Sequence, residues 1–502
     1  MEDLLRYVVF TVSTVLILAG NTSPIRAKAL GASVRVAGFL MLLLLLPYWY
    51  LDPTPSVLLT VSVVVGSLVT LYTPGYSSRK YGTGLLQVLV DFFTLSVVLV
   101  FASRYLLEFI AFWLVTEVLG FFVVVYDAML GINPRAWSAG LRYLVVSMVP
   151  ADLSLLLLLA LVGLEDSLSV PLTELRPDLT TPILTVLAMV GFFAKAAVAP
   201  LHFWLPDAHS MAPSPGSAIL SGIMVKMGIY GITRLALMPS IDRGIAALVC
   251  LVFGSLTSIY GGLQAIVQSD IKRILAYSTI SHTSTMTLLL GLYILSGSSQ
   301  FLAATLIYAA AHAIYKASLF MDSGVVEVLT HTRSIERLGY VSRFAPGETL
   351  SAVISVLSLI GVPPTLGFLT KLAVFMSLAG HIPQSWVYLV ATVIVAFEVI
   401  LSVGYSVRYL LAHVGNPSYR YEEIDPGALK LTPYVLTLSV TSVVLPYYVL
   451  TAIGVVPALG LPLQVVYLLL VLTALFGIAS WVTYSMLKRG RRDEVWLGGA
   501  RP

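Results

Sequence analysis

The sequence predicts an all-α polytopic membrane protein of about 14–15 transmembrane helices, with two inverted five-helix repeats in which helices 7 and 12 are broken. Hydrophobic residues make up 58% of the 502 residues and charged residues only 11%, against about 25% charged residues in soluble proteins. Apolar stretches near the ~20 residues that cross a bilayer recur along the whole chain. In two of these stretches a lysine stands beside two prolines. These observations exclude an ordinary soluble domain.

Fifteen apolar stretches are long enough to be spans. They cover residues 4–20, 30–51, 56–74, 84–102, 104–127, 139–163, 182–200, 215–238, 244–267, 274–295, 299–329, 349–379, 384–412, 431–453 and 462–487. The first stretch lacks the cleavage pattern of a secretory signal and begins with Glu2 and Asp3 beside Arg6. It is therefore expected to remain in the chain as a span.

The basic residues outside the spans support this count, because positive residues concentrate in cytoplasmic loops. When the loops after odd-numbered spans are placed on one side, that side collects twenty lysines and arginines and the other side five. This bias predicts an N-terminus outside and a C-terminus in the cytoplasm. The net charge of +4 then follows from topology, and no nucleic-acid partner is expected.

Prolines interrupt the seventh and twelfth spans. Pro200 and Pro206 follow Lys195, whereas Pro363 and Pro364 precede Lys371. Broken helices in corresponding positions of two halves indicate an inverted-repeat transporter with its site near the midplane. The predicted regions are N-terminal helices 1–3 (1–83), a first five-helix half-channel (84–238), a second one (239–412), and C-terminal helices with a basic tail (413–502).

Four lysines, Lys195, Lys226, Lys316 and Lys371, lie inside apolar spans. A lysine at the bilayer centre costs roughly 2.5–3.5 kcal/mol, so four that faced lipid would cost on the order of 10 kcal/mol. We therefore expect these lysines to face one another, other polar groups or water.

Glu117 lies among apolar residues in the middle of the fifth span. Two interpretations are open: a protonated glutamate with a structural role only, or an ion pair with Lys195 that keeps the carboxylate charged. Making and breaking such a pair would shift the pKa of the lysine, and each pKa unit corresponds to about 1.36 kcal/mol.

Two histidines complete a set of titratable groups. His312 and Lys316 are four residues apart and share a helical face, and His282 lies in the neighbouring span among hydroxyl residues. Histidine titrates near neutrality and burial brings lysine there, as a proton relay requires. The alternative is that each histidine is a hydrogen-bonded packing residue.

Neither a metal nor a cofactor is expected in this chain. His202 and His209 flank Asp207, but Pro206 is expected to break their helix, and no HExxH pattern accompanies them. The single cysteine, Cys250, excludes an internal disulfide and a cysteine-ligated cluster. Nucleotide-binding and nucleophile-elbow motifs are absent from the sequence, so any redox chemistry would belong to other chains.

Several segments carry a resemblance to a known family. The most specific is KAAVAPLHFWLPDAH from Lys195, followed by APSP and by VKMGIY, which ends at Tyr230. DIKRILAYST from Asp270, HAIYK from His312 and PPTLGFLTK from Pro363 accompany it. These segments, within roughly residues 55–410, resemble the antiporter-like subunits of respiratory complex I, Mrp-type cation/proton antiporters and membrane-bound hydrogenases.

The resemblance implies a role for each matching residue. The matches are Glu117 and Lys195 for the uptake-side pair, Lys226 for the central lysine, His282 and His312 for the relay histidines, and Lys371 for the terminal group of the broken twelfth helix. Lys316 belongs to the same set, and Glu398, Asp207 and His202 are expected to support the path. Arg142, Gly216, Asp127 and Asp152 depart from the family's usual residues, which leaves the uptake path open.

The resulting hypothesis is a subunit that moves protons from Glu117 and Lys195 through Lys226, His282 and His312 to Lys371. The resemblance implies a redox-driven ion pump in a prokaryotic plasma membrane, with further membrane subunits, a peripheral redox arm and lipids as partners. This chain would be its non-redox subunit. Sodium/proton exchange by an Mrp-type subunit, and a proton-inert scaffold subunit, are the two alternatives.

Overall fold

The computed structural model describes residues 2–22, 28–49, 52–415, 425–443 and 471. Within these ranges the chain is helical, with three isolated bridges and no β-strand, which confirms the predicted all-α class. Eleven helices of the described part are long and apolar enough to cross a membrane, as in a multi-pass membrane protein. The predicted span 462–487, except residue 471, and the predicted span 431–453 beyond residue 443 lie outside the described residues.

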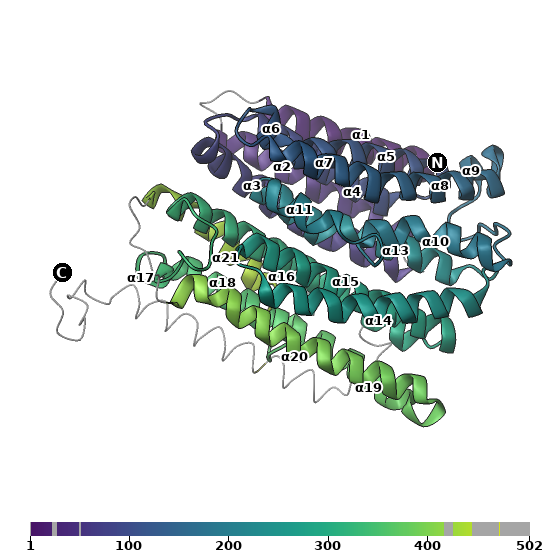
Figure 1. Cartoon of the computed structure of the whole chain (residues 1–502). Helices are drawn as coiled ribbons and strands as arrows, with labels where there is room; N and C mark the ends of the chain where they lie inside the picture. The colour runs from purple at the N-terminus through teal and green to yellow at the C-terminus, as the bar shows by residue number, and fades with distance from the viewer. Residues whose placement is uncertain (1, 23–27, 50–51, 416–424, 444–470, 472–502) are drawn as a thin grey trace.

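The helices outside the two broken spans follow the predicted stretches. They are α1 (Glu2–Asn21), α2 (Lys28–Met41) with its 3₁₀ continuation η2 (Leu42–Trp49), α3 (Pro53–Lys80), α4 (Leu85–Ala102), α5 (Leu106–Val124), α6 (Tyr126–Met129), α7 (Arg135–Tyr143), η3 (Leu144–Met148), α8 (Val149–Val162), α9 (Leu164–Ser169), α12 (Ser214–Ile219), η4 (Leu220–Met224), α13 (Val225–Leu237), α14 (Arg243–Val267), α15 (Ile271–Ser296), α16 (Ser299–Thr330), α17 (Val341–Phe344), α20 (Trp386–Val414), η6 (Pro426–Leu431) and α21 (Thr432–Thr441). Figure 1 shows them side by side, with α1–α8 on one side of the bundle and α14–α20 on the other. The long helix α16, in the second of these groups, contacts α3, α12, α15, α18, α19 and α21.

Both spans predicted to be broken are broken. The seventh consists of α10 (Pro182–Ala196) and α11 (Trp204–Met211), and α10 ends at Ala197 in the left-handed conformation. Pro200 lies in the break, as predicted. The prediction for Pro206 is wrong: it lies in the first turn of α11, where a helix has no use for the missing N–H donor.

The twelfth span consists of α18 (Pro346–Ile360) and α19 (Leu366–His381), which the short 3₁₀ turn η5 (Ile382–Gln384) follows. Pro363 and Pro364 lie between the two helices, as predicted, and Gly361 ends α18 with a φ of 90°. Such a positive φ suits glycine because it has no Cβ.

The start of α19 packs directly on the end of α18. A Cβ atom built on Gly367 would lie 1.6 Å from the carbonyl oxygen of Ser358. The missing side chain therefore lets the two half-helices meet at the break. A Cβ atom built on Gly380, near the other end of α19, would have no atom within 4 Å.

We expect Gly367→Ala to destabilise the protein, because backbone atoms must move to admit the methyl group. Overpacking of this kind costs about 1–3 kcal/mol or more. Gly380→Ala on the same helix is the matched control and is expected to be neutral or slightly stabilising. Thermal unfolding in detergent compares the two variants, and equal midpoints would contradict the packing described for Gly367.

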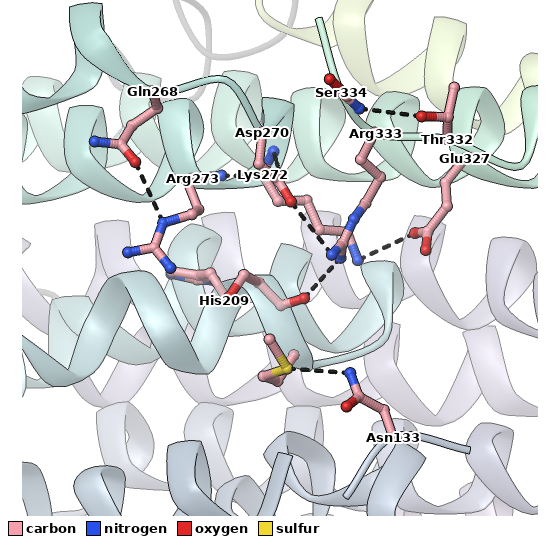
Figure 2. A network of polar contacts seen from close by, with 12 residues as sticks. Asn133, His209, Gln268, Asp270, Lys272, Arg273, Glu327, Thr332, Arg333 and Ser334 are labelled. Carbon is pink, nitrogen blue, oxygen red and sulfur yellow. Dashed lines mark hydrogen bonds and ion pairs between the residues drawn. The ribbon is translucent and has the colours of Figure 1, made fainter. Parts of the chain in front are cut away.

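Loops after odd-numbered spans meet at one end of the bundle, which we call the basic end. Lys80 at the end of α3 and Lys272 at the start of α15 both pair with Glu327 of α16, at 3.0 and 3.4 Å. Arg333, just after α16, pairs with Asp270 at 3.2 Å. Figure 2 shows Lys272 and Arg333 within this network.

Loops before odd-numbered spans meet at the opposite end. Arg6 of α1 pairs with Glu108 of α5 at 2.8 Å, and Arg234 of α13 pairs with Asp52, just before α3. The structure thus separates the two sets of loops in the way that the distribution of basic residues predicts.

Apolar side chains cover the outer faces of the bundle. On α14 and α20, exposed residues recur at helical spacing: Leu248, Val252, Leu256, Leu263, Leu389, Val393, Phe397 and Ile400. An exposed apolar belt of this kind suits contact with lipid or with another membrane subunit.

Candidate functional site

Polar side chains form a buried series through the middle of the bundle, which we call the central line. Its members are Glu117, Lys195, Lys226, His312, His282, Tyr308, Lys371 and Glu398. Lys371 is 8% exposed and the others 1% or less. Because burial of polar atoms is costly, each needs a partner within the bundle or in bound water.

The first members are Glu117 on α5 and Lys195 on α10, whose charged groups are 2.6 Å apart. The indole of Trp113, one turn before Glu117, donates to the carboxylate at 2.9 Å. The ammonium group also faces the rings of Trp113 and Tyr143, at 5.5 and 5.2 Å from their centres. Lys195 lies in the last turn of α10, where the helix dipole favours a cation. The predicted contact is present, and Asp152 lies beside Glu117.

Lys226 follows a π-helical segment, η4, in the eighth span. Its ammonium group donates to the main-chain oxygen of Ser221 at 2.6 Å and lies 2.5 Å from Nδ1 of His312 on α16. A π turn leaves a carbonyl free for such a contact. Lys226 thus contacts one titratable partner, the imidazole of His312, and one partner that does not titrate, the main-chain oxygen of Ser221.

The structure reverses the expected order of the two histidines. His312 lies beside Lys226, whereas His282 on α15 contacts the hydroxyls of Tyr308 at 2.5 Å and Tyr405 at 2.9 Å. The imidazole rings of the two histidines are 5.4 Å apart. The line therefore runs from Lys226 to His312 and then to His282.

Glu398 on α20 joins the last members. One of its carboxylate oxygens is 3.1 Å from the ammonium group of Lys371, and the other is 3.3 Å from Nδ1 of His282. Lys371 also donates to the hydroxyl of Tyr308 at 3.3 Å. Glu398 is therefore the shared counter-ion of this part of the line.

Lys316 occupies a side position. Although it shares a face with His312, its ammonium group bonds to the Ser278 hydroxyl and to the main-chain oxygen of Leu275, the latter at 3.3 Å. Both partners are on α15. Lys316 is buried with the other members, but its direct contacts are neutral.

One interval of the central line has no direct contact. Among the described residues no hydrogen bond connects Lys195 with Lys226, although α10 and α13 pack closely: Gly228 lies against Phe192 and Ala196. The Tyr143 hydroxyl contacts the sulfur of Met224 at 3.7 Å and partly fills this interval. A continuous polar connection across this interval would need water molecules.

Two of the predicted supporting residues lie apart from the central line. Asp207 forms ion pairs with Arg142 and with Arg273, the latter at 3.2 Å, at the basic end. His202 lies in the break of the seventh span, with its ring 4.9 Å from that of Tyr260. Neither contacts Lys195 or Lys226 directly in the described structure.

The basic-end network in Figure 2 was not predicted from the sequence. Arg273 donates to Gln268 at 3.2 Å, and Arg333 donates to the main-chain oxygen of Ser210 at 2.6 Å. Burial alone would lower the pKa of Arg333, but the charges of Glu327 and Asp270 outweigh burial and raise this pKa. The network fixes the ends of α11, α15 and α16 against one another.

A second buried network occupies the N-terminal helices. Asp91 on α4 contacts Arg35 at 3.3 Å and accepts hydrogen bonds from Asn21 at 2.9 Å and Gln87 at 2.6 Å. Within the described residues, no direct contact joins Asp91 to the central line. Its position explains an acidic residue in an apolar span as one half of a buried pair.

His202, Asp207 and His209, which the sequence does not favour as metal ligands, have other neighbours in the structure. Within the described ranges, no group of three or more histidine, cysteine, aspartate or glutamate side chains is arranged to hold a metal ion. The ring of His209 stacks on Phe320 at 4.6 Å.

Trp113 and Tyr308 belong to the site but were not among the residues predicted for it, although their spacing in the sequence indicates them. Trp113 precedes Glu117 by four residues and Tyr308 precedes His312 by four residues, so each shares a helical face with a predicted site residue. Tyr405 shows no such signal, because α20 brings it to His282 from 123 positions away.

Comparison with known proteins finds a matching family. A family model described as NADH:quinone oxidoreductase/Mrp antiporter, transmembrane region, matches residues 107–398, more than half of the chain. Subunit A1 of the Na(+)/H(+) antiporter of Staphylococcus haemolyticus is 31% identical over 386 residues, which is 72% of this chain and 47% of the relative. Hydrogenase-4 component B of Escherichia coli is 29% identical over 331 residues, which is 63% of this chain and 48% of the relative. The chain thus spans about half the length of these curated relatives.

Two solved structures share the fold. The Mrp complex of Dietzia sp. DQ12-45-1b contains a chain with a TM-score of 0.71 and 23% identity; the match covers 97% of this chain and 57% of that one. The membrane-bound sulfane sulfur reductase, an archaeal respiratory membrane complex, contains a chain with a TM-score of 0.72 and 20% identity. That match covers 91% of this chain and 97% of the other.

Proposed function

Because this chain belongs to the NADH:quinone oxidoreductase/Mrp antiporter transmembrane family, we propose that it is a proton-translocating, antiporter-like subunit of a multisubunit ion pump. One observation carries the proposal: the contacts that run from Lys226 through His312, His282 and Tyr308 to Lys371 and Glu398. Each of these side chains holds or accepts a proton, and all are buried. A packing role alone requires no such buried series of titratable groups.

Coulomb repulsion couples the steps. Two like charges about 10 Å apart at an effective dielectric of 20 repel by about 1.7 kcal/mol, more than a tenfold change in a protonation equilibrium. Protonation of one lysine therefore favours loss of the proton from the next. Opening of the Glu117–Lys195 pair removes the counter-ion of Lys195, so it is the natural first step.

We further propose the setting of this subunit. The relatives in the Mrp complex and in the sulfane sulfur reductase are chains of multisubunit membrane complexes, which supports further membrane subunits as partners. A peripheral redox arm would supply the driving reaction, and no cofactor is assigned to this chain. The membrane would be the plasma membrane of a prokaryote, and the excess of basic residues supports a basic end in the cytoplasm and an N-terminus outside.

Sodium/proton exchange is the second candidate, and the name of the Staphylococcus haemolyticus relative favours it. Its central requirement is a set of oxygen ligands for sodium. The contacts of the central line instead join nitrogen groups to one another, as in Lys226–His312 and His312–His282, or to a carboxylate or hydroxyl, as in Lys195–Glu117 and Lys371–Glu398. This composition favours the proton over a metal cation.

The experiment compares proton translocation by the complex in vesicles with and without sodium. We expect translocation to persist in sodium-free buffer and to be insensitive to added sodium, because the line conducts protons alone. A pH-sensitive dye measures proton translocation, and a protonophore, which abolishes the proton gradient, gives the baseline signal. An absolute requirement for sodium would favour the exchanger instead.

A further inference from the structure

A polar stripe lies on one face of α18, outside the central line. Glu348, Ser351, Ser355 and Ser358 occur at intervals of three and four residues, so they share one helical face. All four side chains are 0% exposed. If this face of α18 were buried only for packing, we would expect leucine or valine at these positions.

The stripe runs from the basic end to the break in the twelfth span. Ten residues of α-helix rise about 15 Å, which is half of a ~30 Å hydrocarbon core. At its inner end, the Ser358 hydroxyl accepts a weak hydrogen bond from the Gly367 amide at 3.4 Å. The side chain of Lys371 passes Gly361 at the same place, with its Cγ 2.7 Å from where a Cβ atom of Gly361 would lie.

Hydroxyls from two other helices join the stripe at its middle. The Ser355 hydroxyl lies 2.9 Å from that of Ser318 of α16 and 3.0 Å from that of Ser439 of α21, and the latter two hydroxyls are 2.7 Å apart. Hydroxyl groups donate and accept at once. A triangle of three therefore passes a proton without needing a charged member.

An acid without a basic partner lies at the outer end. The Glu348 carboxyl group lies beside the side chains of Asp322 on α16 and Thr432 on α21. Asp322 accepts from the Tyr409 hydroxyl and from Nε2 of His413, the latter at 3.1 Å. The titratable groups around Glu348 are Asp322 from α16, Tyr409 and His413 from α20, and Tyr72 from α3.

Two neighbouring buried carboxyl groups repel when both are ionised, so a proton held between them is favoured. No lysine or arginine among the described residues contacts Glu348 to prevent this. Glu348 and Asp322 can thus hold a proton at the end of the polar stripe that lies nearest the basic end of the bundle.

We propose that Glu348 and the serine face of α18 form a proton branch that connects the basic end of the bundle with Lys371. The branch rests on the proposed translocation function. It gives the second half of the molecule its own exchange with the basic-end solution, separate from the Glu117–Lys195 pair. Proton transfer along it needs only hydroxyls, carboxyls and water.

The test measures proton translocation by the assembled complex carrying Glu348→Gln, Glu348→Asp or Ser355→Ala. Loss of a transferring acid costs about tenfold or more in rate, so we expect such a drop for Glu348→Gln and recovery in Glu348→Asp. Ser355→Ala is expected to slow translocation several-fold. Ser377→Ala on α19 is the matched control, because this buried serine bonds only to its own helix, at Ala373, and is expected to leave the rate unchanged.

A conducting role also changes how the rate depends on pH at the basic end, which a packing role does not. We expect Glu348→Gln to flatten this dependence. Wild-type rates and an unchanged pH profile in assembled Glu348→Gln would overturn the branch. If that variant does not assemble, a wild-type rate in Ser355→Ala overturns it equally. If Lys195→Ala loses translocation but Glu348→Gln keeps the wild-type rate, only the branch is rejected. If both variants keep the wild-type rate, the proposed function is rejected as well.

Discussion

Lys195→Ala and Glu117→Ala should each abolish proton translocation by the complex while leaving its assembly intact. The two charged groups are 2.6 Å apart in a fully buried site, and within the described part of the chain no other basic side chain forms an ion pair with Glu117. Without Lys195 the carboxyl group keeps its proton, and without Glu117 the lysine loses its counter-ion. We expect the rate to fall by about a hundredfold or more.

Proton uptake by vesicles that contain the assembled complex measures this loss. Lys430→Ala and Glu165→Ala are the matched controls, because both side chains are exposed and lie away from the central line. Native gel electrophoresis verifies assembly. Normal pumping by a well-assembled Lys195→Ala complex would rule out the mechanism and leave the proton-inert scaffold as the function.

Glu398→Gln is expected to have a comparable effect through a different cause. The carboxylate lies between Lys371 and His282, at 3.1 and 3.3 Å, and the amide of glutamine cannot balance the charge of Lys371, or that of His282 when its ring holds a second proton. Removal of one partner of a buried pair costs about 3–5 kcal/mol. We therefore expect loss of translocation together with a lower unfolding temperature.

A double-mutant cycle separates these two effects. In Lys371→Met with Glu398→Gln the buried charge is gone, so the stability losses are expected to be less than additive, by about 0.5–3 kcal/mol. Translocation stays absent in the double variant. Fully additive losses in thermal unfolding would show that the two side chains are not coupled.

The sequence predicts the fold through signals that act locally. Span length, the distribution of arginines and lysines, and the prolines near Lys195 and Lys371 each depend on one segment and the membrane. The structure agrees in the helical class, in both breaks and in the separation of the loops. Pro206 was misjudged because a proline in the first turn of a helix resembles, in sequence, one that ends a helix.

The sequence does not predict which side chains of distant helices contact one another. That Lys226 meets His312 and not His282 depends on how α13 lies against α16. Tyr405 and Glu398 reach His282 from another span. The partners of Lys316 depend on side-chain direction, since a shared face with His312 did not produce a contact.

The π-helical segment η4 has a consequence for how the protein tolerates change. The bond that holds Lys226 at 2.6 Å ends on a main-chain oxygen of Ser221, so no exchange of the Ser221 side chain removes it. What maintains the bond is the extra residue in that turn. The anchor is therefore robust to point substitution and vulnerable to deletion of a single residue within 220–224, which would return the turn to α-helical register and carry the ammonium group away from His312.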